Sequence, residues 1–528
     1  MQEQCLGMVA ALTIAAAAAI AMAKDESVSA ANAPAGALVA PAEWLKAQPK
    51  PAFREGHTLP PLTRYGWVLD LDTRVELAEH WGYGLEWGGY ADAKGVERVL
   101  ATPEDPAAKC MALAAKDPRR YKLVVICSRE LPKNDAVPPE TWTRNAEGKF
   151  LNGQAKSMDG TTWHQGMDVV YSPAAPDSVW EEAGRLRAEP IRAIRAKCPI
   201  AIVLNGGEYG LGVFGFAGKV WSQDPAILKA KGDKPWFDYI SERKARAELL
   251  IANAVRKAVP DRQLYIYYTT TGGTHRNHTP GWQDWGPGYE WMKPVSDLAS
   301  SEHYYRHFNS GWTGDDLLTQ ALNAKGWEIA NGQPLCYDWL CAGWPREKGL
   351  GSGAADPLGD RGFGDLTRYT GFLKCLYVSG MVGGNAGYYD YPQGGFAAKF
   401  PADQPPHWLR QMVSLARVHA LFSGLEESLR RGDLLPGPEK HRFSKEHPAY
   451  EFPTGEANVR VLARKLKDKP EWLLAAWAAD GRDRSVKTTL PELGAVTLQA
   501  RACGSVYRAA LRGGKMDLIQ VDARVGGK

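Results

Sequence analysis

The sequence has no excess of charge of one sign. Its 528 residues carry a net charge of only +4, and acidic and basic residues are interspersed along the chain. A protein that binds nucleic acid usually shows a basic patch or stripe, and none is evident here. We therefore expect no nucleic-acid partner. After residue 23 the chain also lacks an apolar run long enough to cross a bilayer, so we expect no stable membrane insertion of the mature protein.

Cysteine is scarce, with eight residues in the whole chain and no CxxC pair. One of them, Cys5, belongs to the N-terminal leader described below. An odd number of remaining cysteines without paired spacing argues against a disulfide framework or a zinc cluster, and we expect no metal or cofactor. Cys336 and Cys341 could pair with each other or with another cysteine, and the sequence leaves this open.

The N-terminus reads as an export signal. Residues 6–23 form an alanine-rich apolar run that ends in Ala-Met-Ala and is followed by Lys-Asp-Glu. This is the pattern of a signal peptide over residues 1–23, although no Lys or Arg precedes the run, and an uncleaved anchor is the alternative. The mature protein is then secreted or periplasmic. Residues 24–61, rich in Ala, Pro and Ser, predict a linker or leader segment.

The central part of the chain alternates short apolar runs with helical patterns. An apolar run without polar alternation is typical of a parallel strand that is covered on both faces. Eight such runs predict an α/β fold, a (β/α)8 TIM barrel over residues 62–430, with an open doubly wound sheet as the alternative. The predicted strands are residues 67–71, 121–127, 167–171, 200–204, 263–269, 295–302, 334–339 and 380–389.

The texture changes near residue 432. Short alternating runs separated by turn residues follow, which indicates a small antiparallel β-sandwich domain over residues 431–528.

Trp and Tyr are abundant, at 19 and 21 residues against only 13 Phe. Amphipathic rings can stack on a sugar face and form a hydrogen bond at one edge, so this balance favours a carbohydrate substrate. Trp285 and Trp312 lie among Gly and Pro in predicted loops and suit a stacking cleft, with core burial as the alternative.

Acidic residues follow four of the predicted strands, namely Glu208, Glu302, Asp338 and Asp390. The carboxyl ends of barrel strands share one rim, where barrel enzymes have their active sites. Cleavage of a glycosidic bond needs two carboxyl groups on either side of it. The sequence therefore predicts a glycosidase that uses two of these acids.

Residues 205–210 (NGGEYG) resemble the Asn-Glu-Tyr-Gly motif of β-galactosidase-type retaining glycosidases with a (β/α)8 barrel. The resemblance implies that Glu208 is the acid/base and that Asn205 binds the sugar 2-hydroxyl. Two glycines separate Asn205 from Glu208 here, whereas the two residues are adjacent in that family. The family also implies a Glu nucleophile after strand seven, where this chain has Asp338, and we favour Glu302 narrowly over Asp338 for that role.

Further sugar contacts are expected from polar and aromatic residues near the same rim. His303 and His307 have helical metal-pair spacing but follow a strand, so hydrogen bonding to sugar or a role in the loop is favoured over metal binding. The alternatives to a glycosidase are a non-catalytic carbohydrate-binding protein on a degenerate barrel and a polysaccharide lyase. The sugar, the linkage and the oligomeric state stay open. The expected substrate-binding residues are Asn205, Tyr209, His275, Arg276, Trp285, His303, Tyr304, Trp312, Trp339, Asn385 and Asp390.

Overall fold

A computed structural model describes residues 36–64, 68–132, 137–151, 154–156, 162–164, 171–206, 221–268, 289–304, 314–341, 366–387, 395–442, 444 and 446–522. The predicted signal peptide lies outside these ranges. Among the helices in them, none combines the length and the apolar character needed to span a bilayer.

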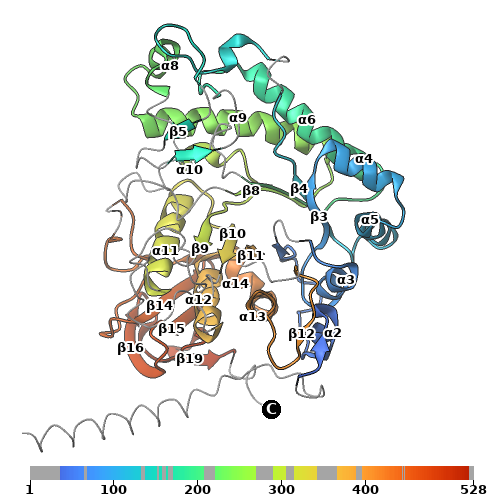
Figure 1. The fold of residues 1–528 in the computed structure, drawn as a ribbon. Coiled ribbons are helices and arrows are strands. Elements are labelled where there is room, and N and C mark those ends of the chain that lie inside the picture. The colour runs from blue at the N-terminus through green and yellow to red at the C-terminus, as the bar shows by residue number, and fades with distance from the viewer. Residues whose placement is uncertain are drawn as a thin grey trace, which may run out of the picture.

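Eight parallel strands form the centre of the molecule (Figure 1). They make two four-stranded sheets, in the orders β3-β4-β7-β8 and β2-β11-β10-β9. The sheets meet at one edge through a parallel bridge between Leu62 and Tyr83. At the other edge the Asp297 N–H donates to the Tyr265 carbonyl at 2.9 Å. The ring is thus closed, and the predicted (β/α)8 barrel is confirmed. Its strands are β2 (Thr63–Arg64), β3 (Leu85–Ala91), β4 (Leu123–Cys127), β7 (Ile202–Gly206), β8 (Leu264–Tyr268), β9 (Glu302–Tyr304), β10 (Cys336–Cys341) and β11 (Met381–Ala386).

Helices follow the strands along the chain and surround the barrel. Aspartate N-caps begin several of them, because a carboxylate can accept the free N–H groups of the first turn. Asp70, Asp92, Asp105 and Asp224 cap α3, α4, α5 and α8 in this way. The helices are α3 (Leu71–His80), α4 (Ala93–Ala101), α5 (Pro106–Lys116), α6 (Asp177–Arg195), α8 (Pro225–Lys231), α9 (Trp236–Ala258), α10 (Tyr289–Met292), α11 (Gly314–Ala330), α12 (Leu366–Ser379), α13 (His407–Ser423) and α14 (Glu426–Arg431), with a 3-10 turn η2 (Pro139–Thr141) and a hairpin β5 (Gln154–Lys156)–β6 (Thr162–His164) after β4.

The first two strands of the barrel are not among the predicted strands. The first strand is Thr63–Arg64 rather than residues 67–71, where the chain instead enters α3 behind its Asp70 cap. The second is Leu85–Ala91, where no strand was predicted. Residues 167–170 lie outside the described part of the chain, and Tyr171 forms an isolated bridge with Trp142. Even so, β7 is the fourth strand and β9 the sixth, as predicted.

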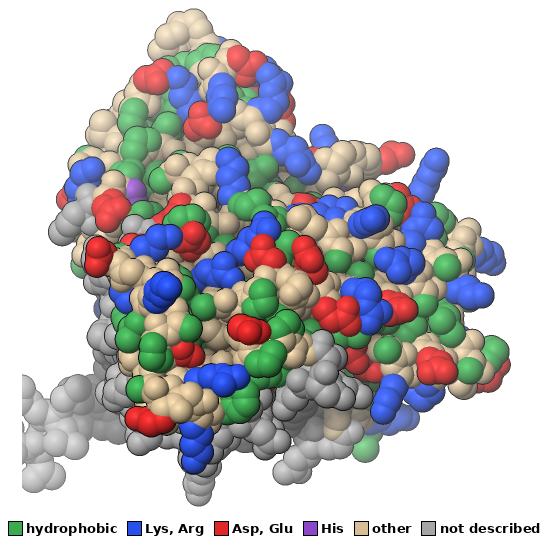
Figure 2. All heavy atoms as spheres, turned by 90° about the horizontal axis from the view of Figure 1, so that it is seen from above, with side chains coloured by type: hydrophobic (Ala, Val, Ile, Leu, Met, Phe, Trp, Pro, Cys, Tyr) green, Lys and Arg blue, Asp and Glu red, His purple; other side chains and the backbone are tan. Residues whose placement is uncertain are grey.

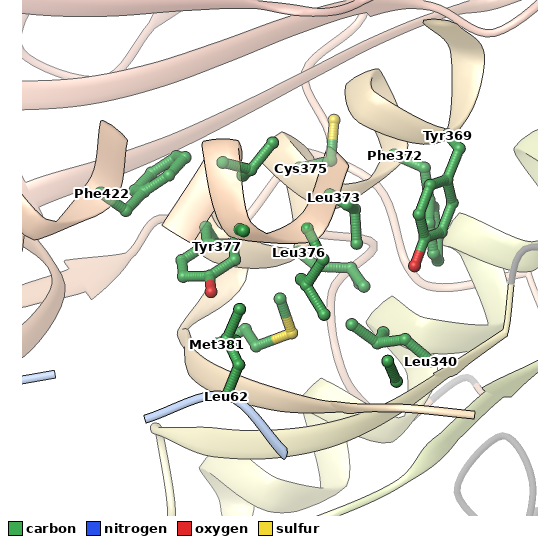
Figure 3. Close-up of a cluster of buried hydrophobic side chains, with 14 of the residues drawn as sticks. Leu62, Leu340, Tyr369, Phe372, Leu373, Cys375, Leu376, Tyr377, Met381 and Phe422 are labelled. Carbon is green, nitrogen blue, oxygen red and sulfur yellow. The ribbon is translucent and has the colours of Figure 1, made fainter. Parts of the chain in front are cut away.

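The main core lies between the barrel wall and its helices. Figure 3 shows Tyr377, Leu376 and Leu373 of α12 directed towards Met381, Leu340 and Leu62 of the strand layer. These side chains are at most 1% exposed. Burial of this kind contributes about 1.5–3 kcal/mol for each large side chain, so the layer between helices and strands holds the barrel together.

The segment before the barrel is part of the same core. Strand β1 (Leu38–Val39) pairs with β12 (Phe400–Pro401), and helix α2 (Pro41–Ala47) buries Trp44 against the main cluster. Farther on, the Thr58 N–H donates to Oε2 of Glu426 at 2.9 Å. A linker that drapes over the fold is therefore the wrong description for residues 38–61.

The C-terminal domain is antiparallel, as predicted. Its five-stranded sheet has the order β13-β14-β15-β18-β19, and the β16-β17 hairpin packs Val486 and Leu498 into a shared core with that sheet. The domain meets the barrel at α12, where Trp477 lies so close to Gly371 that a Cβ there would be 2.2 Å from the indole. The strands are β13 (Gly432–Leu434), β14 (Val459–Leu466), β15 (Glu471–Ala478), β16 (Arg484–Leu490), β17 (Gly494–Ala500), β18 (Ser505–Arg512) and β19 (Lys515–Gln520).

The surface carries charges of both signs. On the face that Figure 2 shows, Lys and Arg side chains lie among Asp and Glu side chains rather than in a patch of their own.

Candidate active site

A cluster of apolar side chains identifies the inner face of the barrel. Val124, Ile126, Ile202, Leu204, Ile266 and Tyr337 pack together although they come from four different strands, β4, β7, β8 and β10. Side chains of one strand alternate between its two faces, and residues side by side in a parallel pair share a face. The strand register therefore assigns every other strand residue to the lumen or to the helix layer.

Glu302 belongs to the lumen layer at the carboxyl end of the strands. It is aligned with Trp339 of β10, which is aligned with Asn385 of β11, which is aligned with Thr63 of β2. Trp339 lies two residues beyond Tyr337 and so faces the same way. Glu302, Trp339 and Asn385 are 2%, 4% and 2% exposed. The sixth, seventh and eighth strands thus bring a carboxyl, an indole and an amide, all expected site residues, into one layer.

This layer contains a donor with no protein partner. Oδ1 of Asn385 accepts a hydrogen bond from Oγ1 of Thr63 at 3.3 Å, while its Nδ2 has no partner. Buried amides nearly always have their hydrogen-bonding groups satisfied, so an open donor in a lumen is suited to a ligand or an ordered water. Gly387 borders the layer, because a Cβ there would be 2.6 Å from Nε1 of Trp339.

Residues at the ends of the second and third strands also border the lumen, although the sequence did not predict them as site residues. Tyr90 of β3 is aligned with Ile126, and the Arg129 guanidinium lies 4.8 Å from its ring centroid. Ser128 follows β4, continues the alternation of Val124 and Ile126, and is buried with no hydrogen-bond partner for its Oγ. Ser128 and Arg129 directly follow an apolar strand, and a polar residue in that position is the sequence feature that could have identified them.

A buried ion pair lies between the first two strands. Glu86 of β3 accepts the Arg64 N–H at 2.8 Å and pairs with the Arg64 guanidinium at 2.8 Å. Burial raises the pKa of Glu86 to about 7, against the opposing effects of Arg64 and Arg74. Glu86 is aligned with Val124 of the apolar lumen cluster and so faces the lumen, where the Arg64 guanidinium holds its carboxyl.

Asp338 faces the helix layer. It alternates with Tyr337 and Trp339, and its neighbours are polar groups behind the wall. Oδ1 accepts the Ser301 N–H at 3.2 Å, and Oδ2 lies 3.4 Å from Nε2 of His303. Cys336 is a free thiol, and its Sγ lies 2.9 Å from Oδ2. The geometry therefore does not support Asp338 as a nucleophile or His303 as a sugar ligand, since both side chains point away from the lumen.

Asn205 is also on the outer face. Its Nδ2 donates to Oε2 of Glu248 on α9 at 3.3 Å and to the Tyr265 hydroxyl at 2.9 Å. Both partners are buried behind the strands. The expected contact between Asn205 and a sugar hydroxyl is not supported by this placement.

The other expected site residues cannot be placed against this geometry. Strand β7 ends at Gly206, two residues before Glu208. The backbone of Tyr304 is described, but not its side chain. In the part of the chain that is described, no group of three or more His, Cys, Asp or Glu residues is arranged to hold a metal ion. Outside the described residues lie Glu208, Tyr209, His275, Arg276, Trp285, Trp312 and Asp390.

No protein-family model matches this chain, and no curated protein matches it in sequence. Distant likenesses appear among solved structures. Trehalose-6-phosphate hydrolase of Bacillus licheniformis is 9% identical, with a TM-score of 0.43 over 88% of this chain and 98% of that one. An Anoxybacillus α-amylase is 10% identical, with a TM-score of 0.40 over 87% and 86%. The β-galactosidase Gan42B of G. stearothermophilus is 11% identical, with a TM-score of 0.42 over 71% of this chain and 58% of that one.

Proposed function

We propose that the protein is a glycoside hydrolase whose active site lies at the carboxyl end of the barrel. The observation that carries the proposal is the position of Glu302, a buried carboxyl in the lumen layer beside Trp339 and Asn385. An indole that can contact a sugar face and an open amide donor are the companions that such a carboxyl needs.

The second carboxyl in the proposal is Glu208, which follows the fourth strand. Strands β7 and β9 are separated only by β8 around the barrel, so their ends are two strand spacings apart, about 9–10 Å. Inward side chains can bridge part of that distance. The carboxyl groups of retaining enzymes are about 5–5.5 Å apart and those of inverting enzymes about 6.5–9.5 Å.

We propose the retaining course. Glu208 donates a proton to the glycosidic oxygen while a carboxylate oxygen of Glu302 attacks the anomeric carbon, so the C–O bond to the leaving group breaks and a glycosyl ester forms. Water then attacks the same carbon, Glu208 takes its proton, and the ester bond breaks to release the sugar and regenerate Glu302. Burial of Glu302 keeps bulk water away from the ester.

The test begins with a screen of aryl glycosides and of plant and marine polysaccharides for released reducing sugar. With a substrate in hand, Glu208→Gln is expected to lower kcat by about 10²–10⁴-fold, and Glu302→Ala by at least as much. Azide should restore turnover to Glu302→Ala as a glycosyl azide. The matched control is Glu189→Gln, an exposed acid of α6.

Other outcomes would overturn the proposal. Full turnover by Glu302→Ala would exclude Glu302 as the nucleophile, and sugar binding without turnover would favour a carbohydrate-binding protein. An unsaturated product absorbing in the near ultraviolet would identify a lyase. NMR of the first-formed anomer distinguishes retention from inversion.

We also propose that the protein is exported, from the leader pattern of residues 1–23. A mature chain that begins at Lys24 in mass spectra of the native host's secreted or periplasmic fraction is the expected result.

A further inference from the structure

Behind the strand that carries Glu302 lies a buried polar cluster, formed by Ser301, His303, Lys325, Glu328, Cys336 and Asp338. All six side chains belong to residues at most 2% exposed. They come from the sixth strand segment, the seventh strand and helix α11. Burying charged groups in a core lowers the stability of the protein unless every group is paired, so a role for this cluster is expected.

The contacts within this cluster converge on the two residues that flank Glu302. On one side, Ser301 donates its N–H to Oδ1 of Asp338 at 3.2 Å, and its Oγ lies 3.4 Å from Oε1 of Glu328. On the other side, Nε2 of His303 lies 3.4 Å from Oδ2 of Asp338. Lys325 and Glu328 form an ion pair one turn apart on α11. Residues 301 and 303 are therefore held from behind, while Glu302 between them faces the lumen.

The backbone pairing of the sixth strand differs between its two neighbours. Strand β9 has three residues, and its pairing with β8 is replaced by contacts of the preceding residues 296 and 297. On the β10 side, the carbonyls of Ala299 and Ser301 accept the N–H groups of Tyr337 and Trp339 at 2.8 Å each, and the ladder of β9 itself begins at the pair of Glu302 and Trp339. The side-chain contacts therefore hold the outer face of the segment in addition to its backbone bonds to β10, and in place of a ladder with β8.

We propose that Asp338 is a positioning residue which, together with Lys325 and Glu328 of α11, fixes the Ser301–Glu302–His303 segment and thereby the direction of the Glu302 carboxyl. This inference rests on the proposed function for its catalytic consequence. The anchoring of the segment can be measured whether or not the protein is a glycosidase. A displacement of about 1 Å in a reacting group can cost about 10²-fold in rate.

Two substitutions of Asp338 separate its roles. Asp338→Asn keeps an oxygen that can accept the Ser301 N–H but removes the charge, and Asp338→Ala removes both. The matched control is Asp522→Asn, because Asp522 is also a buried acid in an ion pair, with Lys374 at 2.7 Å, at the interface with the C-terminal domain. Any general effect of neutralising a buried aspartate should appear in the control too.

The first readout is hydrogen exchange of a peptide covering residues 299–305 in the full-length protein. We expect Asp338→Ala to accelerate exchange in this peptide, Asp338→Asn to change it little, and Asp522→Asn to leave it at the wild-type rate. Unchanged exchange in folded Asp338→Ala overturns the anchoring role, and it does so without any assumption about activity.

The second readout is kinetic. On the substrate found by the screen, we expect Asp338→Ala to lower kcat by about 10²-fold with little change in KM, since an oriented carboxyl matters most in the transition state. Removal of a negative charge near Glu302 should also move the acid limb of the pH profile of Asp338→Asn to lower pH. The ionisable groups that face Asp338 are His303 of β9, Cys336 of β10 and Lys325 and Glu328 of α11.

The two measurements distinguish failure of the positioning role from failure of the proposed function. Altered exchange in Asp338→Ala without any glycosidase activity in the wild type would leave the anchoring intact and contradict the proposed function. Equal kcat in Asp338→Ala and Asp522→Asn, with an active wild type, would contradict the positioning role and leave the proposed function standing.

Discussion

The ends of the fourth and sixth strands hold similar positions in the barrel but differ behind the wall. Behind β7, a neutral amide, Asn205, connects the strand to the Glu248 carboxyl and the Tyr265 hydroxyl. Behind β9, the connection runs through the charged groups of Asp338, Lys325 and Glu328. A polar residue at a strand end can therefore stabilise the barrel wall instead of contacting a ligand. The outer face of the wall can be stabilised through a neutral amide or through charged groups.

Protonation separates the two regions further. Burial raises the pKa of Glu248 in spite of the nearby Arg187 and Lys244. Burial would also raise the pKa of Asp338, but His303 and Lys325 outweigh it and hold that pKa below its ordinary value. The surroundings thus shift the carboxyl behind the fourth strand towards its neutral form and the one behind the sixth towards its ionised form.

The largest expected loss of stability comes from removing Lys325 from the charged groups behind β9. Lys325→Met removes the cation that faces Glu328 and Asp338, and leaves two carboxyl groups in a core with less compensation. Breaking a buried pair from one side costs about 3–5 kcal/mol, so we expect a loss of that size in the free energy of unfolding, measured with urea. A loss below about 1 kcal/mol would show that the region is more hydrated than its burial implies.

A second prediction concerns Glu86, the buried acid of the second strand. Its folded pKa of about 7 lies above the ordinary 4.5, so the unfolded chain releases its proton first as the pH rises. Between pH 4.5 and 7 the wild type should therefore lose stability, by up to about 3 kcal/mol, and lose no more from this group above that window. Urea unfolding of Glu86→Gln at pH 5 and pH 8 should lack this loss. Parallel pH dependence in both proteins would mean that Arg64 keeps Glu86 ionised throughout.

Stability should depend less on the neutral Asn205 behind the fourth strand. Asn205→Ala removes two hydrogen bonds and leaves the Tyr265 hydroxyl and Glu248 without that partner, for an expected loss of about 1–3 kcal/mol in the free energy of unfolding. Its effect should stay smaller than that of Lys325→Met in the same urea titration. A larger loss for Asn205→Ala than for Lys325→Met would contradict the proposed difference between the contacts behind β7 and those behind β9.

The smallest expected effect is a difference in how the stability contributions of Glu248 and Asp338 change with pH. Because the pKa of Glu248 is raised, its contribution to stability is present at low pH and declines as the pH rises above its ordinary value. Because the pKa of Asp338 is lowered, its contribution is present above its ordinary value and is lost as the pH falls. We therefore expect the stability differences between wild type and Glu248→Gln and between wild type and Asp338→Asn to change with pH in opposite directions. Slopes of the same sign would remove the proposed contrast.

Much of the architecture was predictable because it depends on patterns along the chain. Apolar runs such as residues 200–204 mark strands buried on both faces, and Asp N-caps mark helix starts. The failures have local reasons. Strand β2 has only two residues and gives almost no periodic signal, while Gly88 and Gly89 in β3 adopt positive φ angles at an irregularity that resembles a loop in sequence.

The site was predictable only in part. Glu302, Trp339 and Asn385 were all expected and do meet in one layer, whereas Asn205, His303 and Asp338 face the helices. The sequence offered no means to separate these groups, because a strand buried on both sides has no hydrophobic alternation to distinguish its faces.

The sequence by itself determined the order of strands and helices, the change to an antiparallel domain near residue 432, and the set of acids that follow strands. Only the tertiary structure decided which of those residues face the lumen. That decision depends on the register between neighbouring strands and on what covers their outer face, and a shift of one residue would exchange Glu302 for His303. Such information lies in contacts between distant segments, here β9, β10 and α11, and not in any single segment.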